Sequence, residues 1–397
     1  MVYLDYAATT PLDPAVLKKM LPYFSREFAN PASIHTPGQR ALKAVDDARY
    51  EIASIISAKA TDIVFTSGAT ESNNLILSSI AAGKTAHIIT TKVEHDSILE
   101  PLHALEKKGA RVSYLDVDRR GLINPSDIEK ALRPETVLVT IGYVNSETGV
   151  IQPIKKIGRL IKNYNERLLK QWLNTSTRKR GLRPKTVFFH TDATQAANFC
   201  DLSVRSLHLD AMSLSAHKIY GPKGIGLLYA ADELKLVPLL RGGHQERNLR
   251  SGTLNVPAIV GFAEALGLAK RVEKRTSAMI KKLRGKLMQG INKACPEAII
   301  NTPLDSASPS HVNITFPGIE GDIMQAALDE QGIAVSTGSA CASGNVSASH
   351  VLLAMGRGEE AARSSIRFTV GRQTSAKDIE RALKTISGVY KRLRKAI

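Results

Sequence analysis

Short apolar runs alternate with longer segments of helical periodicity along most of the chain. Runs rich in β-branched or aromatic residues predict buried strands over 63–66, 87–91, 136–141 and 186–190. Leu209–Ser215 and Gly226–Tyr229 predict two more strands that are neighbours across a glycine-containing turn. Strands that alternate with helices indicate an α/β fold, in which helices cover both faces of a largely parallel sheet.

The pattern changes after Gly252. A long helical pattern covers Val256 to Cys295, and two further strands are then predicted, over 311–316 and 364–372. We therefore expect two domains: a large one over 16–251, and a smaller one over 252–397 that the N-terminal arm, 1–15, rejoins.

The composition is that of a globular protein, with 43% hydrophobic and 23% charged residues among 397. No apolar run approaches the roughly 20 residues that cross a bilayer. Met1–Tyr6 lacks the basic start and apolar core of a signal peptide, so we expect a cytoplasmic protein without membrane contact. The three cysteines have neither CxxC spacing nor an even count, which argues against a disulfide framework and against a stable metal site.

The net charge is +17, and much of it is local. Segment 163–186 contains seven basic residues and a single acidic one, Glu166. Such a run is usually a solvated loop or helix face, but it also suits contact with an acidic partner such as a nucleic acid.

Lys218 carries the strongest chemical signal. It ends the sequence Ser215-Ala216-His217-Lys218, which follows an apolar run and precedes a glycine-rich turn. A lysine becomes catalytic when its pKa is lowered or when it forms an imine. With Ser215 and His217 as phosphate donors, the pattern predicts a lysine that carries pyridoxal phosphate. Seen alone, Lys218 would be a surface lysine in a turn.

Three strand ends supply suitable companions. Gly68-Ala69-Thr70 lies between a strand and a helix, where backbone amides bind anions such as phosphate. Asp192 follows an apolar strand and provides the anion that keeps the cofactor's ring nitrogen protonated, with Gln195 placed for the ring hydroxyl. His95 follows another strand and suits stacking and proton exchange. The alternative for each is a helix cap, and for His95 also a surface histidine.

Three further residues are candidates for the same site. Arg367 lies on a probable strand and can clamp a carboxylate, although a surface ion pair is the alternative. Asn145 lies at a strand end, with a turn as its alternative. Cys341 has small polar neighbours, typical of an accessible loop, whereas Cys200 and Cys295 resemble inert buried cysteines.

In these segments the chain resembles the cysteine desulfurases, pyridoxal-phosphate enzymes of aminotransferase class V that supply sulfur for iron–sulfur clusters and tRNA thiolation. Similar segments follow the family's order over nearly the whole chain: 3–10, 30–33, 66–74, 94–95, 145–149, 192–195, 215–218, 250–253 and 338–341. The ten positions from Cys341 to Val351 resemble the long loop of the housekeeping and nitrogen-fixation subgroup. The basic stretch 164–185 departs from the family and looks like an insertion in the large domain.

The resemblance implies fold type I of the pyridoxal-phosphate enzymes: a large domain with a mostly parallel seven-stranded sheet, and a smaller α+β domain that carries the catalytic cysteine loop. It also implies roles for single residues. Cofactor binding would fall to Lys218 (covalently), Ala69, Thr70, Ser215 and His217 (phosphate), Thr253 (phosphate, from the partner subunit of a homodimer), Asn145 and Gln195 (ring hydroxyl), Asp192 (ring nitrogen) and His95 (stacking). Substrate binding would fall to Arg367 and Asn30, and catalysis to Lys218, His95 and Cys341.

The implied reaction converts L-cysteine to L-alanine and leaves a persulfide on Cys341. The sulfur acceptor would be an iron–sulfur scaffold protein, with a transient contact between Cys341 and the cluster, or a tRNA-thiolation protein. A weak tRNA contact through the basic insertion is a further expectation. Alternatives are a selenocysteine lyase or a related class V enzyme, a nucleic-acid-binding module, and an inactive scaffold partner.

Overall fold

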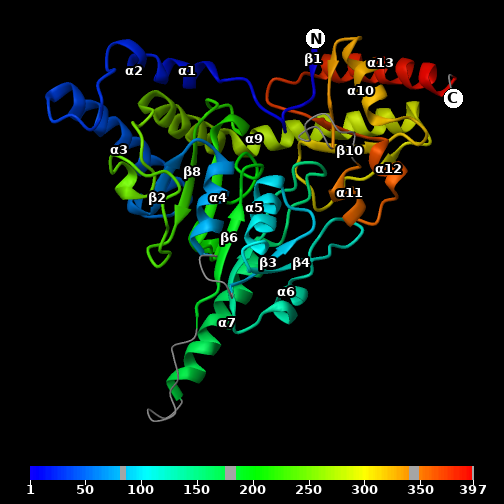
Figure 1. Cartoon of the computed structure of the whole chain (residues 1–397). Helices are drawn as coiled ribbons and strands as arrows, with labels where there is room; N and C mark the ends of the chain where they lie inside the picture. The colour runs from blue at the N-terminus through cyan, green and yellow to red at the C-terminus, as the bar shows by residue number, and fades with distance from the viewer. Residues whose placement is uncertain (81–85, 175–184, 339–347, 396–397) are drawn as a thin grey trace.

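The computed structural model describes residues 1–80, 86–174, 185–338 and 348–395 (Figure 1). A seven-stranded sheet forms its centre. In spatial order its strands are β2 (Ile63–Thr66), β8 (Gly226–Ala230), β7 (Ala211–Ser215), β6 (Phe188–Asp192), β5 (Thr136–Thr140), β3 (His87–Thr91) and β4 (Arg111–Leu115). Only β8 runs antiparallel to its neighbours, so the mostly parallel α/β sheet is confirmed.

Helices cover both faces of this sheet. The helices of this part of the chain are α1 (Pro14–Met20), α2 (Pro22–Ser25), α3 (Thr36–Ile56), α4 (Ala69–Ile80), α5 (Asp96–Glu106), α6 (Pro125–Ala131), α7 (Ile154–Asn174) and α8 (Val204–Leu207), with short 3-10 turns at Ala60–Asp62, Ala216–Lys218 and Glu246–Asn248. Neighbouring strand residues enter different cores: Ile88 packs with α4 and α5, whereas Ile89 packs with α3 and α7. The inner strands are therefore buried on both faces, whereas edge strand β4 is partly exposed.

A second, antiparallel sheet contains β12 (Ser336–Thr337), β13 (Ser365–Thr369), β10 (His311–Thr315) and β9 (Ile299–Ile300). Beside it lie α10 (Gly321–Asp329), α11 (His350–Ala354), α12 (Glu359–Arg363) and α13 (Ala376–Arg394). The chain's start returns here, because β1 (Val2–Tyr3) pairs with β11 (Ile333–Ala334) and Asp5 bridges to Thr369. The boundary between two domains stays a prediction.

One long helix joins the two regions. Helix α9 (Val256–Ala294) has 39 residues, and Figure 1 shows it running behind both sheets. Its first half packs in the core of the large sheet through residues such as Phe262. Its second half packs against the small sheet through residues such as Leu287. None of the helices in the described part of the chain is long and apolar enough to cross a membrane.

The strand expected over 186–190 begins later, at Phe188. The side-chain amide of Asn165 explains the shift, since it accepts from the N–H of Val187 at 3.0 Å and donates to its carbonyl at 2.9 Å. Those backbone groups are thus withdrawn from the sheet. Asp192 becomes the last residue of β6 rather than a residue beyond it.

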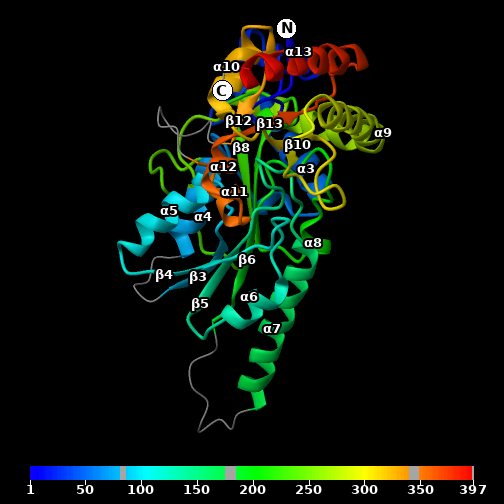
Figure 2. The ribbon, with the colours of Figure 1, turned by 90° about the vertical axis from the view of Figure 1, so that its right-hand side faces the viewer.

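The predicted basic insertion, 164–185, begins inside helix α7. Buried Ile154, Ile157 and Ile161 anchor the first half of this helix, and none of the residues from 162 to 174 is fully buried. Figures 1 and 2 show that its end projects beyond the sheet. Residues 175–184 lie outside the described residues, as does Cys341.

Candidate active site

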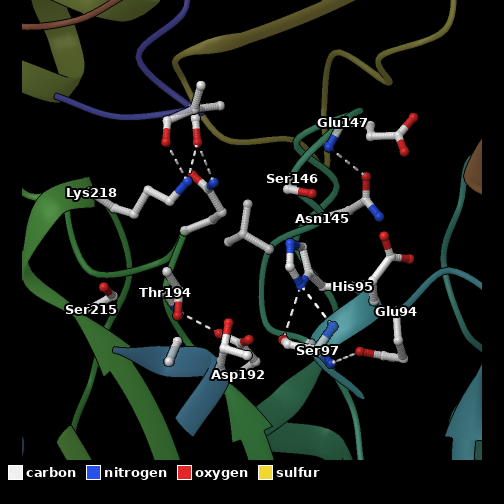
Figure 3. A pocket seen from close by; sticks show the side chains of 18 of the residues that line it. Glu94, His95, Ser97, Asn145, Ser146, Glu147, Asp192, Thr194, Ser215 and Lys218 are labelled. Carbon is white, nitrogen blue, oxygen red and sulfur yellow. Dashed lines mark hydrogen bonds between the residues drawn. The ribbon is translucent and has the colours of Figure 1, made fainter. Parts of the chain in front are cut away.

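A cavity of about 750 Å³ opens where the carboxyl ends of the large sheet's strands face the small sheet (Figure 3). It collects most of the residues that the sequence singled out. These are Ala69, Thr70, His95, Asn145, Asp192, Gln195, Ser215, His217, Lys218 and Arg367.

Lys218 enters this cavity from the 3-10 turn that follows β7. Its Nζ donates to the carbonyls of Ala7 and Ala8 at 2.6 and 2.8 Å. The N-terminal arm, which contains Ala7 and Ala8, also fixes the turn itself, because the N–H and hydroxyl of Thr10 donate to the carbonyl of His217. Residues more than 200 positions apart therefore hold the amine in place, and the surface-lysine interpretation is wrong.

An anion-binding end lies at the start of α4. The first turn of a helix directs unpaired N–H groups outward, here from Ala69 and Thr70. Strand β8 passes close behind, and any side chain at Gly226 would collide with Gly68. Opposite Gly68, the nearest atom to an added Cβ is the Ser215 hydroxyl, at 3.9 Å. Hydroxyl donors and amides thus surround open space suited to a phosphate.

Two lysines add positive charge to the anion-binding end. Lys223 lines the cavity beside Lys218 and His217. Burial lowers the pKa of His217 to about 4, and the charges of Lys218 and Lys223 act in the same direction. His217 is therefore neutral near pH 7 and can hydrogen-bond a phosphate oxygen without adding charge.

Asp192 forms an anionic end between β6 and the turn that follows. Its carboxylate accepts from the N–H of Thr194 at 2.9 Å and from the amide of Asn73 at 2.8 Å. No basic side chain among the described residues forms a salt bridge with it. The hydroxyl of Thr194 is buried and has no hydrogen-bond partner in the described part of the chain. Both features fit a ligand with a protonated ring nitrogen and polar substituents.

His95 caps helix α5 and lines the cavity at the same time. Its Nδ1 accepts from the N–H of Ser97 at 3.1 Å and lies 2.9 Å from the Ser97 hydroxyl. An Nδ1 that accepts leaves the ring proton on Nε2. The cap alternative is correct for its backbone role, and the capping bond also fixes the orientation of the ring at the cavity.

Asn145 and Gln195 are held by the surrounding backbone. The side-chain Oδ1 of Asn145 accepts from the N–H groups of Glu147 and Thr148, so the turn interpretation is correct. Its amide nitrogen donates to Val93 at 3.0 Å and keeps a second hydrogen for a ligand. The amide of Gln195 donates to Ala7 at 2.9 Å.

Arg367 brings a buried guanidinium to the opposite wall. It lies on β13 and is only 7% exposed, which excludes a surface ion pair. Its terminal nitrogens bond the Asp5 carboxylate at 2.8 Å and the Ser146 carbonyl at 3.0 Å. Its Nε is buried and has no partner within the described residues. A substrate carboxylate bound here would share the guanidinium with Asp5.

Three predicted site residues are not brought to the cavity. Asn30 is exposed, and its side chain accepts from the N–H of Ala32. Thr253 is exposed as well, and its expected role needs a second chain. Cys341 lies outside the described residues. The roles of these three stay predictions.

The other two cysteines differ from an accessible thiol. Cys200 and Cys295 are both buried. Burial raises the pKa of Cys200 to about 12 and that of Cys295 to about 11. Neither forms the reactive thiolate near neutral pH.

Two buried acids of the cavity were given no role from the sequence. Burial raises the pKa of Glu94 to about 7, although its carboxylate accepts from the Thr91 hydroxyl at 2.6 Å and from the N–H of Gly142 at 2.7 Å. Burial also raises the pKa of Glu147, against the hydrogen bond from Ser349. Glu94 lies three residues after the end of β3, and a glutamate so close to a buried strand is a usable signal in the sequence.

The family model for aminotransferase class V matches residues 2–169 and 177–382. The chain belongs to this family. Cysteine desulfurase IscS of Dictyoglomus turgidum is 40% identical over 396 residues, covering 99% of this chain and 95% of that protein. Putative cysteine desulfurase IscS 1 of Bacillus subtilis is 41% identical and covers 99% of both chains. The resemblance to the cysteine desulfurases is thereby confirmed.

Solved structures agree with this assignment. A NifS-like protein superposes with a TM-score of 0.88 at 35% identity, covering 98% of this chain and 99% of that one. A NifS-like protein of Rickettsia africae gives 0.85 at 30% identity, with the same coverage. Class V enzymes of this kind depend on pyridoxal phosphate, and the cavity of this desulfurase fits the cofactor: an anion-binding end, an acidic end and a lysine between them.

Proposed function

We propose that this desulfurase takes sulfur from L-cysteine, releases L-alanine and retains the sulfur as a persulfide on Cys341. One observation carries the proposal. Lys218, Asp192 and Arg367 face a single cavity, and Gly338 and Ser349, on either side of the segment that contains Cys341, line the same cavity. This arrangement supports a substrate amino acid held between Lys218 and Arg367, next to the segment that contains Cys341.

The residues divide the work at the cofactor. Pyridoxal phosphate, when bound, supplies an electron sink for the substrate carbons. Ala69, Thr70, Ser215 and His217 would bind its phosphate, and Asp192 would keep its ring nitrogen protonated. Lys218 would hold it covalently, and the lysine amine, once free, would remove the proton from Cα of the substrate. His95 is placed to move further protons, and Arg367 orients the substrate carboxylate.

In the sulfur transfer, breaking the substrate's C–S bond accounts for the electrons of the new S–S bond. The Cys341 thiolate attacks the substrate sulfur, so an S–S bond forms while the C–S bond breaks. The electron pair of the broken bond passes to the carbon, which gains a proton to become the methyl group of alanine. The enzyme cysteine is oxidised to the persulfide, and the substrate carbon is reduced. No external oxidant is needed.

We further propose a homodimer in which Thr253 completes the partner's phosphate site. Large apolar side chains support it: Phe24 is 60% exposed, Phe28 is 74% and Ile34 is 96%. A monomer rarely leaves several such residues open to water on one segment. Asn30, the second expected carboxylate ligand, lies in this segment and would approach a substrate only in the assembled dimer.

A protein of iron–sulfur assembly is the acceptor that the layout favours over a direct RNA contact. The cavity lies at the carboxyl ends of the strands, whereas the end of α7, which leads into the basic stretch of the sequence, projects at the opposite ends of the strands (Figures 1 and 2). A tRNA bound weakly beside α7 would remain far from the cavity. A reducing compartment suits a free reactive thiol, so we propose a cytoplasmic location. One relative, 43% identical, is described as mitosomal.

The direct test is to incubate the purified holoenzyme with L-cysteine and to quantify alanine and protein-bound sulfur. We expect alanine to accumulate and about one sulfur atom per chain to be retained before an acceptor thiol is added. Formation of pyruvate or of an amino-group transfer product, with no sulfur retained on the protein, would indicate another class V reaction. Selenocysteine lyase is the second candidate, and turnover of selenocysteine without turnover of cysteine would favour it.

A further inference from the structure

The two ends of the segment that contains Cys341 meet at one buried carboxylate. The Ser349 hydroxyl donates to Oε2 of Glu147 at 2.5 Å. A Cβ placed on Gly338 would collide with the same Oε2 and would lie 3.2 Å from the Cβ of Ser349. Ten residues separate these two positions in the sequence, so the chain returns nearly to its starting point.

Glu147 is well placed to hold these ends. Its side chain is only 6% exposed, and its backbone N–H is fixed by the Asn145 side chain at 3.0 Å. The positively charged Arg367 lies near it, and the carbonyl of Ser146, the preceding residue, accepts from this guanidinium at 3.0 Å. Three successive residues thus connect different parts of the site. Asn145 is the expected contact of the cofactor ring, Ser146 contacts Arg367, and Glu147 contacts the ends of the Cys341 segment.

A second hydrogen bond fixes the end of the segment just after Ser349. The Nε2 of His350 lies 3.0 Å from the carbonyl of Glu94, the residue before His95. Ser349 also caps helix α11 by accepting from the N–H of Leu352 at 3.1 Å. The return of the segment is therefore fixed at two successive residues, while its start is fixed only by close packing of Gly338 on Glu147.

We propose that Glu147 is a positioning residue for sulfur transfer, which holds Gly338 and Ser349 together and so sets where Cys341 meets the substrate. The proposal rests on the proposed function, in which Cys341 accepts the sulfur. Fixing both ends of a short segment restricts the positions that its thiol can reach. Misplacement of a reacting group by about 1 Å lowers rates by up to roughly 100-fold.

The experiment compares three holoenzyme variants that disturb this contact in different ways: Ser349→Ala, Gly338→Ala and Glu147→Gln. We expect alanine production to fall by about 10-fold to 100-fold in Ser349→Ala and Gly338→Ala, and by less in Glu147→Gln, whose amide oxygen still accepts a hydrogen bond. The KM for L-cysteine and the change in cofactor absorbance on adding it should stay within about two-fold, because those steps do not use the thiol.

Ser203→Ala is the matched control. Ser203 caps α8 as Ser349 caps α11, accepting from the N–H of Ser206 at 3.3 Å, but it lies away from the cavity. We expect both Ser→Ala variants to lower the melting temperature by similar amounts, and only Ser349→Ala to slow alanine release. In the double variant with Glu147→Gln, the loss should not exceed that of Ser349→Ala alone, since both changes act on one contact.

A loss of cofactor binding or of the absorbance change in proportion to the lost turnover would overturn the proposal, because it would show a general structural role. Unchanged alanine production in both Ser349→Ala and Gly338→Ala would overturn it as well. The alkylation rate of Cys341 by iodoacetamide, mapped by mass spectrometry, separates this proposal from the proposed function. We expect a change of at least about three-fold in both variants, even if Cys341 proves not to accept sulfur; no change would refute the role of Glu147.

Discussion

The cofactor end and the sulfur end of the cavity are built in different ways. At the cofactor end, Thr70, Asp192 and Lys218 each lie within four residues of a strand end. At the sulfur end, Arg367 contacts Asp5 and Glu147 contacts Ser349 across more than 200 residues of sequence. The first end takes its side chains from local strand–turn geometry, although the N-terminal arm also holds Lys218 through Ala7 and Ala8. The contacts of the second end come only from the packing of distant segments.

The largest effect is expected at the cofactor end. Lys218→Ala removes both the covalent attachment and the base, so alanine production should fall by at least about 10³-fold. The variant should also lose its bound cofactor on dialysis, as followed by absorbance. Lys223→Ala, which removes a cation from the same wall, should retain the cofactor more weakly and keep most of the activity. Equal losses in the two variants would show that only charge matters here.

The raised pKa of Glu94, at the same end of the cavity, should make the stability of the fold depend on pH. Its folded-state pKa is raised from 4.5 to about 7 by burial, so the bound proton stabilises the fold below pH 4.5, and this contribution is lost as the pH rises through 7. The shift corresponds to roughly 3 kcal/mol. Glu94→Gln cannot ionise.

Urea unfolding of the cofactor-free chain measures this effect. The stability of Glu94→Gln relative to the unmodified chain should rise by about 3 kcal/mol between pH 4.5 and pH 8. The exposed control Glu380→Gln should show no such trend. Parallel pH curves for Glu94→Gln and the unmodified chain would contradict the assignment.

A smaller effect is expected at the sulfur end. Arg367→Lys keeps the positive charge but loses the planar pair of donors, so the KM for L-cysteine should rise by about 10-fold. The cofactor absorbance should not change. Arg372→Lys is the matched control, because Arg372 stacks on Tyr220 at 4.0 Å and does not line the cavity. An unchanged KM in Arg367→Lys would remove this residue from substrate binding.

Sequence reasoning reached most of the cofactor end because its chemistry follows recognisable strands. The strands containing Ile63 and His87 have the predicted bounds, since both are unbroken runs of buried residues rich in β-branched side chains. Edge strand β4 escaped prediction because it is partly exposed and mixes Arg111 and Ser113 with apolar residues. The start of β6 was misplaced because a side chain, Asn165, competes for the backbone of Val187.

The sulfur end could be predicted only in part. The residue type and strand of Arg367 predict a carboxylate-binding role, but nothing near it in sequence indicates its partner Asp5. The contact of Glu147 with Ser349 has no local pattern either, because it forms only when two distant segments pack together. Long-range pairs of this kind are fixed by tertiary packing, and a single sequence does not reveal them.

The central claim is that the cofactor site and the Cys341 thiol act on one substrate molecule. Cys341→Ala tests it most directly, in a single mixing experiment that follows cofactor absorbance and alanine together. The account predicts that L-cysteine still changes the absorbance with the affinity of the unmodified enzyme, while alanine and protein-bound sulfur fall to trace levels. Alanine release at the full rate from Cys341→Ala would contradict it.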